Sequence, residues 1–346
     1  MNRQKIENWL REENPKRLEE LWQMADAVRQ ENVGNEVHLR GLLEISNYCV
    51  RKCAYCGINV DNNAISRYRM TRDEILECAQ KAVSFGYGTL VIQSGEDYGL
   101  TREFIADIVN YVKDKTPLAV TLSLGERSFE DLKHWRACGA DRYLLRFETS
   151  NSDLYKFIHP PFSSENFRRD RFVILNELKQ LGYEIGSGVM IGIPGQTFAM
   201  LAEDILRFCE LDLDMIGVGP YISHPATRLA ASLKNVAANE DQVPNSEEMT
   251  YKVVALTRLI CPQANIPSTT ALATLNTVNG RELGLMRGAN VVMPNLTPPE
   301  YRVKYEIYPN KACVSETAEQ CQECLHLRIA AMGRKIGKGK GSRVRG

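Results

Sequence analysis

The sequence lacks several features that would place a protein in a large functional class at once. It has no apolar run long enough to span a bilayer, and its charged N-terminus, MNRQKIENWLREENPKRLEELW, lacks the apolar stretch of a signal peptide. Its 43 basic and 43 acidic side chains cancel, so no overall charge attracts nucleic acid or an anionic membrane. Neither a P-loop string nor a Ser-His-Asp set is recognisable, which removes the corresponding hydrolase classes. We therefore expect a cytoplasmic protein with neither a nucleic-acid nor a membrane partner.

The chain does contain enough apolar residues, 44% of 346, to form a large core. Its length fits two small domains or one large barrel. Helix-length patterns such as TRDEILECAQKAVSFG and FAMLAEDILRFCEL separate most of its short apolar runs. Alternating strands and helices predict a parallel α/β sheet, and eight such repeats predict a complete (β/α)8 TIM-type barrel. The eight runs are VHLRGLLEI, TLVIQSG, LAVTLSLG, RYLLRFE, IGSGVMIGI, MIGVGPYI, IPSTTALA and NVVMPNL.

Four segments follow from this pattern. Residues 1–36 predict an N-terminal extension of one or two amphipathic helices, and residues 37–296 predict the barrel. Residues 297–332 form a cysteine-containing C-terminal segment that we expect to act as a lid. Residues 333–346, GRKIGKGKGSRVRG, are rich in glycine and base and predict a flexible tail. A docking arm for an acidic partner is the alternative for that tail.

Ten cysteines in a cytoplasmic protein indicate thiols or metal ligands rather than disulfides. Cys49, Cys53 and Cys56 crowd the loop CVRKCAYC directly after the first predicted strand. Soft thiolates favour zinc or an iron–sulfur cluster. Three ligands would leave one iron of a [4Fe–4S] cluster open to a substrate or cofactor, whereas zinc would need a distant histidine. Unligated thiols so close together would be prone to oxidation.

A second cysteine set lies near the C-terminus, in CVSETAEQCQEC. Its CxxC end predicts another metal site, formed by Cys313, Cys321 and Cys324. The other cysteines occur singly in helical patterns and are predicted to be small buried apolar residues. They are Cys78, Cys138, Cys209 and Cys261.

The CxxxCxxC spacing after the first strand of a barrel is similar to the hallmark of the radical S-adenosylmethionine (SAM) superfamily. From about residue 35 to residue 335, further strings resemble the HydE family of [FeFe]-hydrogenase maturases, which is related to biotin synthase and methylornithine synthase. The strings are RYRMTRDEI, QSGED, VTLSLGE, GADRYLLRFET, GIPGQT, IGVGPYISHP, NIPSTTA and GANVVMPN. The resemblance implies that Cys49, Cys53 and Cys56 hold a [4Fe–4S] cluster whose unique iron chelates SAM. It also implies an auxiliary [2Fe–2S] or [4Fe–4S] cluster at the second cysteine set, a feature that varies among relatives.

The resemblance assigns SAM contacts to Arg146, Glu148 and Arg171. The first two lie two positions apart on one predicted strand and so share a face, and Arg146 also enters the catalytic set. A planar guanidinium suits the SAM carboxylate, the role implied for Arg171. Structural salt bridges are the alternative for all three.

Other expected cofactor contacts cluster at predicted strand ends. Ser94, Gly95 and Glu96 occupy the place of the family's GE motif near the methionyl amine, although many relatives have two glycines before the acid. Thr121 and Ser123 can turn their hydroxyls toward the same site. The positions implied for the adenine and for closure of the pocket are Tyr55, Met190, Ile191, Gly192, Tyr305 and Tyr308.

We expect a small substrate deeper in the barrel, in a pocket with little inward charge beyond Arg146. Because Thr269 and Thr270 are adjacent, only one would point inward in a regular strand. His224 has no visible acid–base partner and is predicted to pack in a loop. The predicted substrate-lining residues are Met215, Ser268, Thr269, Thr270 and Met293.

The resemblance implies an enzyme that reductively cleaves SAM to a 5′-deoxyadenosyl radical. In the family, this radical acts on a small cysteine-bound iron carbonyl–cyanide complex during assembly of the di-iron H-cluster of [FeFe]-hydrogenase. A tyrosine-lyase maturase supplies that complex, and a GTPase scaffold maturase receives the product. The alternatives are a radical SAM mutase of the methylornithine synthase type and a non-catalytic metal-binding scaffold.

Overall fold

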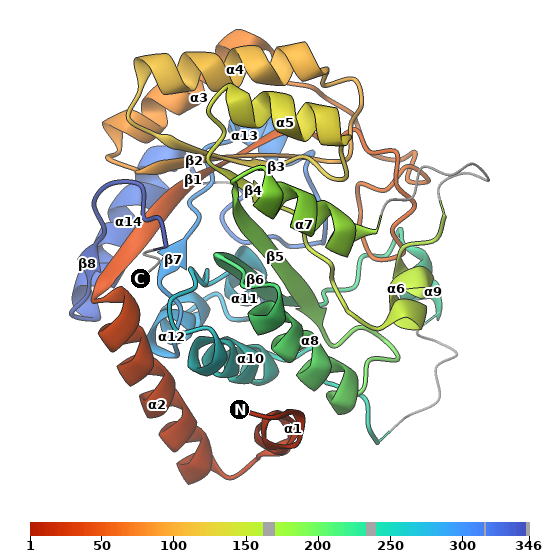
Figure 1. Ribbon diagram of the computed structural model, residues 1–346, viewed down its shortest axis with the longest axis vertical. Coiled ribbons are helices and arrows are strands. Elements are labelled where there is room, and N and C mark those ends of the chain that lie inside the picture. The colour runs from red at the N-terminus through yellow and green to blue at the C-terminus, as the bar shows by residue number, and fades with distance from the viewer. Residues whose placement is uncertain (162–169, 233–239, 315, 344–346) are drawn as a thin grey trace.

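A ring of parallel strands surrounded by helices forms the centre of the molecule (Figure 1). The computed structural model describes residues 1–161, 170–232, 240–314 and 316–343. Neighbouring strands follow the order β6-β5-β4-β3-β2-β1-β7, as expected for successive right-handed βαβ units. The strands are β1 (Glu36–Ser46), β2 (Thr89–Ser94), β3 (Ala119–Ser123), β4 (Arg142–Leu144), β5 (Glu184–Ile191), β6 (Met215–Pro220) and β7 (Val291–Val292).

A short extended segment, residues 265–267, closes the ring between β6 and β7. Asn265 bridges to Met215 on one side, and Pro267 bridges to Val291 on the other. The predicted complete barrel is therefore confirmed. The predicted strand IPSTTALA is shorter than expected, because Thr269 accepts a hydrogen bond from Leu272 N and caps a helix there.

Helices cover the outer face of the sheet and bury the main hydrophobic core against it (Figure 1). The predicted helix after residue 71 begins with a capping box, in which Thr71 and Glu74 satisfy each other's backbone amides. No helix in the described parts of the chain is long and apolar enough to cross a membrane. The helices that follow β1 are α3 (Arg72–Ser84), α4 (Arg102–Lys115), α5 (Phe129–Ala137), α6 (Ser152–Ile158), α7 (Arg171–Gln180), α8 (Phe198–Glu210), α9 (Arg228–Ser232), α10 (Glu247–Ile260), α11 (Thr270–Leu275), α12 (Gly280–Met286), α13 (Pro299–Arg302) and α14 (Ala318–Ala331).

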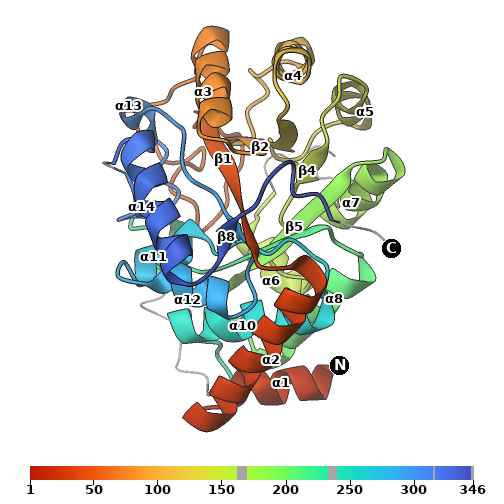
Figure 2. The same cartoon turned by 90° about the vertical axis from the view of Figure 1, so that its left-hand side faces the viewer.

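Two helices form the N-terminal extension, α1 (Arg3–Arg11) and α2 (Pro15–Val33). They are separate because Asn14 caps α2 and Pro15 occupies its first turn. Helix α1 packs on α8 and α2 packs on α10, so the extension covers one side of the barrel (Figure 2). Its buried residues include Leu10, Leu18, Leu21 and Trp22, as the periodicity predicts.

The predicted flexible tail is instead ordered through residue 343, and this corrects the sequence interpretation. A short strand, β8 (Lys335–Ile336), pairs with the start of β1, and the chain then crosses the N-terminal end of the barrel (dark blue in Figure 2). The buried guanidinium of Arg40 donates to Gly341 O at 3.0 Å, and that of Arg142 donates to Lys340 O at 2.9 Å. Glycine here permits close packing rather than mobility, because tail carbonyls satisfy two buried cations.

Substitution of Gly88 tests this docking. A Cβ at Gly88 would lie 1.6 Å from Gly339 O, so Gly88→Ala must push the tail away. We expect the free energy of unfolding to fall by about 1–3 kcal/mol. We also expect the Gly337 amide, which donates to Val37 O, to lose protection from hydrogen exchange. Lys338→Ala, at an exposed tail position, is the control, and unchanged protection in Gly88→Ala would contradict tail docking.

Candidate active site

A cavity of about 360 Å³ runs through the barrel, within the usual size range of small-molecule sites. It extends from Cys49 and Cys56, beyond the C-terminal end of β1, to Arg40 near the start of that strand. Side chains normally fill the inside of a TIM barrel. Here Gly217 and Gly219 occupy inward positions on β6 and leave the space open.

The cysteine loop lies at the end of the cavity where parallel barrels carry their chemistry. Cys49 and Cys56 line the cavity, and Cys53 lines an adjoining recess. Burial raises the pKa of the Cys49 thiol. Burial and the neighbouring thiols raise the pKa of Cys53, and that of Cys56 to about 12. A metal cation that displaces these protons would remove the cost of thiolate formation, so the three thiols suit a metal centre.

The loop is held by close backbone contacts. Gly95 approaches it so closely that a Cβ would lie 2.2 Å from Tyr48 O and 2.9 Å from the Cys49 Cβ. Arg67 supports the other side by donating to the carbonyl oxygens of Asn47 at 2.6 Å and Ile58 at 2.7 Å. Of the predicted GE-type residues, Ser94 and Gly95 both line the cavity.

Glu96 does not line the cavity, contrary to its expected position near the methionyl amine. Its buried carboxylate accepts hydrogen bonds from Arg51 Nε at 2.8 Å, from Glu126 N at 3.0 Å and from the Tyr98 hydroxyl at 2.8 Å. The carboxylate fits there because Gly125 has no side chain; a Cβ would lie 2.7 Å from it. Glu96 therefore braces the cysteine loop.

Arg146 and Glu148 share the cavity, as their spacing predicts. Glu148 has a φ of +63°, a left-handed conformation that is uncommon outside glycine and is often found at functional sites. The two side chains form an ion pair at 2.9 Å. Within the described residues, Arg146 Nε and Thr121 Oγ1 are buried without a hydrogen-bond partner, and the buried Glu148 Oε2 is the atom that pairs with Arg146 Nη2. These atoms offer a donor, an acceptor and a hydroxyl to a ligand.

A buried acid, Asp204 on α8, supports the chain just after Glu148. It accepts hydrogen bonds from the Ser150 amide and hydroxyl. Burial raises the pKa of Asp204 to about 7, against 3.8 in an unfolded chain. The folded state therefore holds this proton more tightly, and the resulting stabilisation is full below pH 4 and is lost as the pH rises to 7.

Asp204→Asn should remove that pH dependence. We expect the wild-type free energy of unfolding to fall relative to the variant's by about 1 kcal/mol per pH unit between pH 5 and pH 7. Urea unfolding of the metal-free protein across this range measures the difference. Asp153→Asn, at an exposed acid on α6, is the control, and parallel profiles for wild type and Asp204→Asn would refute the prediction.

The expected adenine side is only partly assembled in the cavity wall. Tyr55, Ser123 and Met190 line the cavity. Ile191 and Gly192 do not, because Ile191 is fully buried in the core and Gly192 backs onto Asn245. Ile191 and Gly192 are therefore not part of the cavity wall against which the adenine was expected to lie.

The predicted substrate side shows a similar outcome. Met215, Met293 and both threonines, Thr269 and Thr270, line the cavity. Alternation does not apply to the threonines, because Thr269 caps α11 and Thr270 begins it. Ser268 is not in the lining; its hydroxyl donates to Arg281 O at 2.9 Å.

The lid segment contributes Tyr305 and Tyr308 to the lining. The Tyr305 hydroxyl accepts a hydrogen bond from Gln93 Nε2 at 3.2 Å. His224 lies outside the cavity wall; its Nδ1 accepts from Ala226 N at 3.1 Å, and its Nε2 lies 3.6 Å from Glu306.

The sequence analysis missed several charged residues in the lining, and its expectation of little inward charge was wrong. Glu44 on β1 forms a buried ion pair with Lys311 and accepts a hydrogen bond from Asn295 Nδ2 at 3.0 Å. Arg40 lies farther in, and burial beside Arg142 lowers its pKa to about 9, so it stays charged at neutral pH. Two charges of opposite sign four positions apart in VHLRGLLEI, and therefore on one face of a strand, were the available signal.

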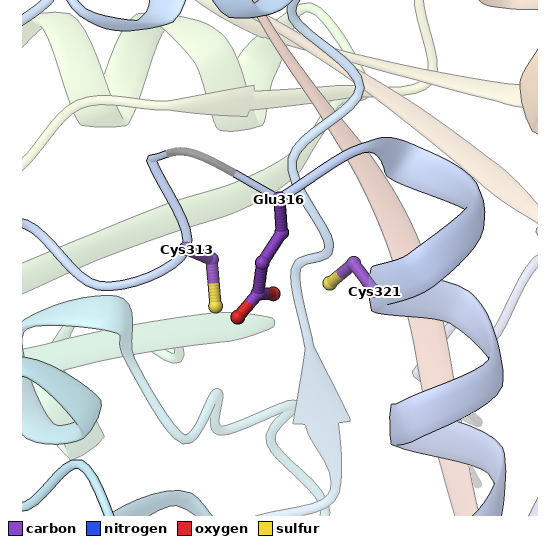
Figure 3. A group of neighbouring side chains, drawn as sticks. All are labelled: Cys313, Glu316 and Cys321. Atoms are coloured by element: carbon purple, nitrogen blue, oxygen red, sulfur yellow. The ribbon is translucent and has the colours of Figure 1, made fainter.

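The C-terminal cysteines form a different donor set from the predicted one (Figure 3). The ligand atoms of Cys313, Glu316 and Cys321 all lie within 4.8 Å of one another, and the three side chains point toward one another. Cys324 is exposed and lies outside this group of three. Two thiols and a carboxylate suit zinc or iron. Of the single cysteines, Cys209 is exposed rather than buried.

Comparison with known proteins decides the family. The Radical SAM superfamily profile matches residues 43–208. Over 94% of the chain and 89% of the relative, the sequence is 47% identical to the [FeFe] hydrogenase maturase subunit HydE of Thermotoga maritima. The chain belongs to the HydE family. As a radical SAM enzyme of this family, it uses a [4Fe–4S] cluster and SAM.

More distant relatives of the HydE family share the fold. A 3-methylornithine synthase of Methanosarcina acetivorans is 28% identical over 81% of the chain and 75% of that protein. The crystal structure of a methylornithine synthase superposes with a TM-score of 0.81 at 24% identity, covering 97% of this chain and 94% of that one. The maturase HydG superposes with a TM-score of 0.72 at 18% identity, covering 96% of this chain and 73% of HydG.

The residues at the HydE-family cluster site fit that cofactor pair. Three half-buried thiols lie together beyond β1, and two of them face the cavity. The unpartnered Thr121 Oγ1 and Arg146 Nε lie in the same cavity wall as the Glu148 carboxylate. A cation, an acid and a hydroxyl match the carboxylate, ammonium and ribose groups of SAM.

Proposed function

We propose that this HydE-family enzyme directs the 5′-deoxyadenosyl radical onto a small cysteine-bound iron carbonyl–cyanide complex, during assembly of the di-iron centre of [FeFe]-hydrogenase. The observation that carries the proposal is the close HydE relationship over nearly the whole chain. The cavity that joins the cysteine loop to the deep end of the barrel supports it, because it gives a radical formed at one end access to a substrate at the other.

In this proposal Cys49, Cys53 and Cys56 hold the [4Fe–4S] cluster. When bound, the cluster supplies the electron that cleaves SAM to methionine and the radical. Arg171 binds the SAM carboxylate, and Arg146 with Glu148 binds its remaining polar groups, because these side chains present charges to the cavity. Tyr55 and Met190 pack against the adenine. The barrel wall excludes solvent from the radical.

The deep half of the cavity is proposed to bind the substrate. Met215, Thr269, Thr270 and Met293 provide thioethers and hydroxyls for an uncharged part of the ligand. Arg40 lies beside them, and its guanidinium donates to the Met215 sulfur and to Gly341 O, neither of which is a carboxylate. A buried cation without a carboxylate favours an anionic substrate, and an iron cyanide complex is anionic.

We further propose that the enzyme works in the cytoplasm with a tyrosine-lyase maturase upstream and a GTPase scaffold maturase downstream. All ten cysteines are free thiols, which suits a reducing compartment. The auxiliary [2Fe–2S] or [4Fe–4S] cluster is proposed at Cys313, Cys321 and a third donor, either Glu316 or Cys324. No reaction step requires it, because it lies apart from the cavity lining.

An anaerobic assay tests the proposal. The protein is reconstituted with iron and sulfide, reduced and mixed with SAM, with and without the product of the tyrosine-lyase maturase. We expect 5′-deoxyadenosine in both samples, in larger amount with that product, and activation of apo-hydrogenase when the scaffold maturase is added. No nucleoside from a loaded, reduced cluster would refute radical chemistry. If the enzyme formed nucleoside, converted added lysine to methylornithine and did not activate the hydrogenase, the result would favour the mutase alternative.

A further inference from the structure

Four buried charged side chains form a network behind the cavity wall, between the cysteine loop and helix α7. Two acids after strand ends, Glu96 and Glu126, pair with Arg51 of the cysteine loop, and Glu126 also pairs with Arg171 of the helix. Their side chains are 13%, 3%, 4% and 10% exposed, respectively. Buried charges persist only when they are paired, so each member depends on the others.

Glu126, which follows β3, connects the two arginines. One carboxylate oxygen accepts a hydrogen bond from Arg171 Nε at 3.0 Å, and the other accepts from Arg51 Nη2. Arg51 lies in the cysteine loop between Cys49 and Cys53, and Arg171 lines the cavity. Through one side chain, Glu126 therefore contacts both the cluster-binding loop and the cation expected to bind the SAM carboxylate.

The orientation of Arg171 depends on few contacts. Its other hydrogen bond runs from Nη1 to Arg146 O, and its guanidinium lies over the Tyr155 ring at 5.6 Å. Without Glu126, Arg51 would keep Glu96 as its partner, whereas Arg171 would lose its carboxylate. The two guanidiniums also repel each other, as the lowering effect of Arg171 on the pKa of Arg51 indicates. Loss of Glu126 should therefore release Arg171 more than Arg51.

We propose that Glu126 is a positioning residue that aims Arg171 at the SAM carboxylate and couples it to the cysteine loop through Arg51. This inference rests on the proposed role of Arg171. In the proposed function, SAM contacts the cluster and Arg171 at the same time, so the distance between these two binding points matters for its affinity. A fixed Glu126 sets the distance between these two binding points before SAM arrives.

The test compares Glu126→Gln with Glu126→Asp, Arg171→Gln and the double variant Glu126→Gln/Arg171→Gln. SAM affinity is measured by equilibrium dialysis on the reconstituted protein, and the reduction potential of the cluster is measured by EPR titration. We expect Glu126→Gln to raise the SAM Kd at least tenfold and to make the potential more positive, because one negative charge near Cys53 is lost. Glu126→Asp should restore much of both. Glu130→Gln, at an exposed acid on α5, is the control.

The double variant separates positioning from a purely structural role. If Glu126 acts through Arg171, the double variant should bind SAM no more weakly than Arg171→Gln alone. Additive losses, or an unchanged Kd in Glu126→Gln, would overturn the inference. Wild-type SAM binding is measured first. If the wild type does not bind SAM, the proposed function fails; if it binds SAM and Glu126→Gln binds equally well, only the coupling fails.

Discussion

Cys53→Ala is expected to abolish SAM cleavage, with a loss of at least ~10³-fold in 5′-deoxyadenosine formation. Cys53 is half-buried in a recess beside Arg51 and Arg171, and no other cysteine lines that recess to replace its sulfur as an iron ligand. Two remaining thiols cannot hold a cubane cluster in one orientation. The measurements are iron content, the EPR signal of the reduced cluster, and nucleoside formation by chromatography.

Cys209→Ala provides the matched control for this prediction. Cys209 is an exposed free cysteine on α8 and does not line the cavity. Its substitution therefore shows whether removing a cysteine affects reconstitution when no proposed cluster ligand is lost. Nucleoside formation at a wild-type rate is expected from the control. A Cys53→Ala protein that still cleaved SAM with an intact cluster signal would exclude the proposed ligand set.

Gly95→Ala is expected to lower nucleoside formation by about 10²-fold without removing any ligand. The new Cβ would approach Tyr48 O to 2.2 Å and the Cys49 Cβ to 2.9 Å, and both atoms belong to the cysteine loop or its anchor. The loop must shift, and displacement of a reacting group by about 1 Å costs about 10²-fold in rate. Iron retained per chain after reconstitution and desalting should fall in parallel.

Gly88→Ala distinguishes this effect from general crowding. Its new methyl group would also clash with a backbone carbonyl, that of Gly339. This carbonyl belongs to the tail, at the end of the barrel opposite the cysteine loop. We expect Gly88→Ala to lose stability and to retain its cluster. If both variants retained iron equally and cleaved SAM at the wild-type rate, Gly95 would have no special role at the cluster site.

The barrel could be predicted from the sequence because each apolar run and each helical pattern is a local signal. The cysteine loop could be predicted for the same reason, since its spacing lies within eight residues. The pairing of Arg146 with Glu148 followed from strand alternation, although Glu148 adopts a left-handed conformation that the sequence does not indicate. Local rules therefore placed these residues at the correct end of the barrel.

The failures involve contacts between residues far apart in the chain. Glu96 faces Arg51 rather than the cavity, because a glycine in another loop leaves room for its carboxylate. Glu44 is satisfied by Lys311, which no short-range pattern connects to it. Cys324 was grouped with Cys321 by spacing alone, whereas Glu316 is the residue whose carboxylate lies within 4.8 Å of both the Cys313 and the Cys321 sulfur. Partner choice over such distances depends on the completed fold.

The docked tail also determines which end of the barrel is completed last during folding on the ribosome. Glu36 pairs with Lys335, so the first strand receives a neighbour that the ribosome adds ~300 residues later. Until then, the guanidiniums of Arg40 and Arg142 lack the carbonyl acceptors of residues 340 and 341. A nascent chain that has completed β6 therefore has strands β1–β6 and helices α1–α8, but not the tail that covers this end of the barrel. Closure at this end is a late event of biosynthesis, and these long-range contacts slow it relative to the local βαβ units.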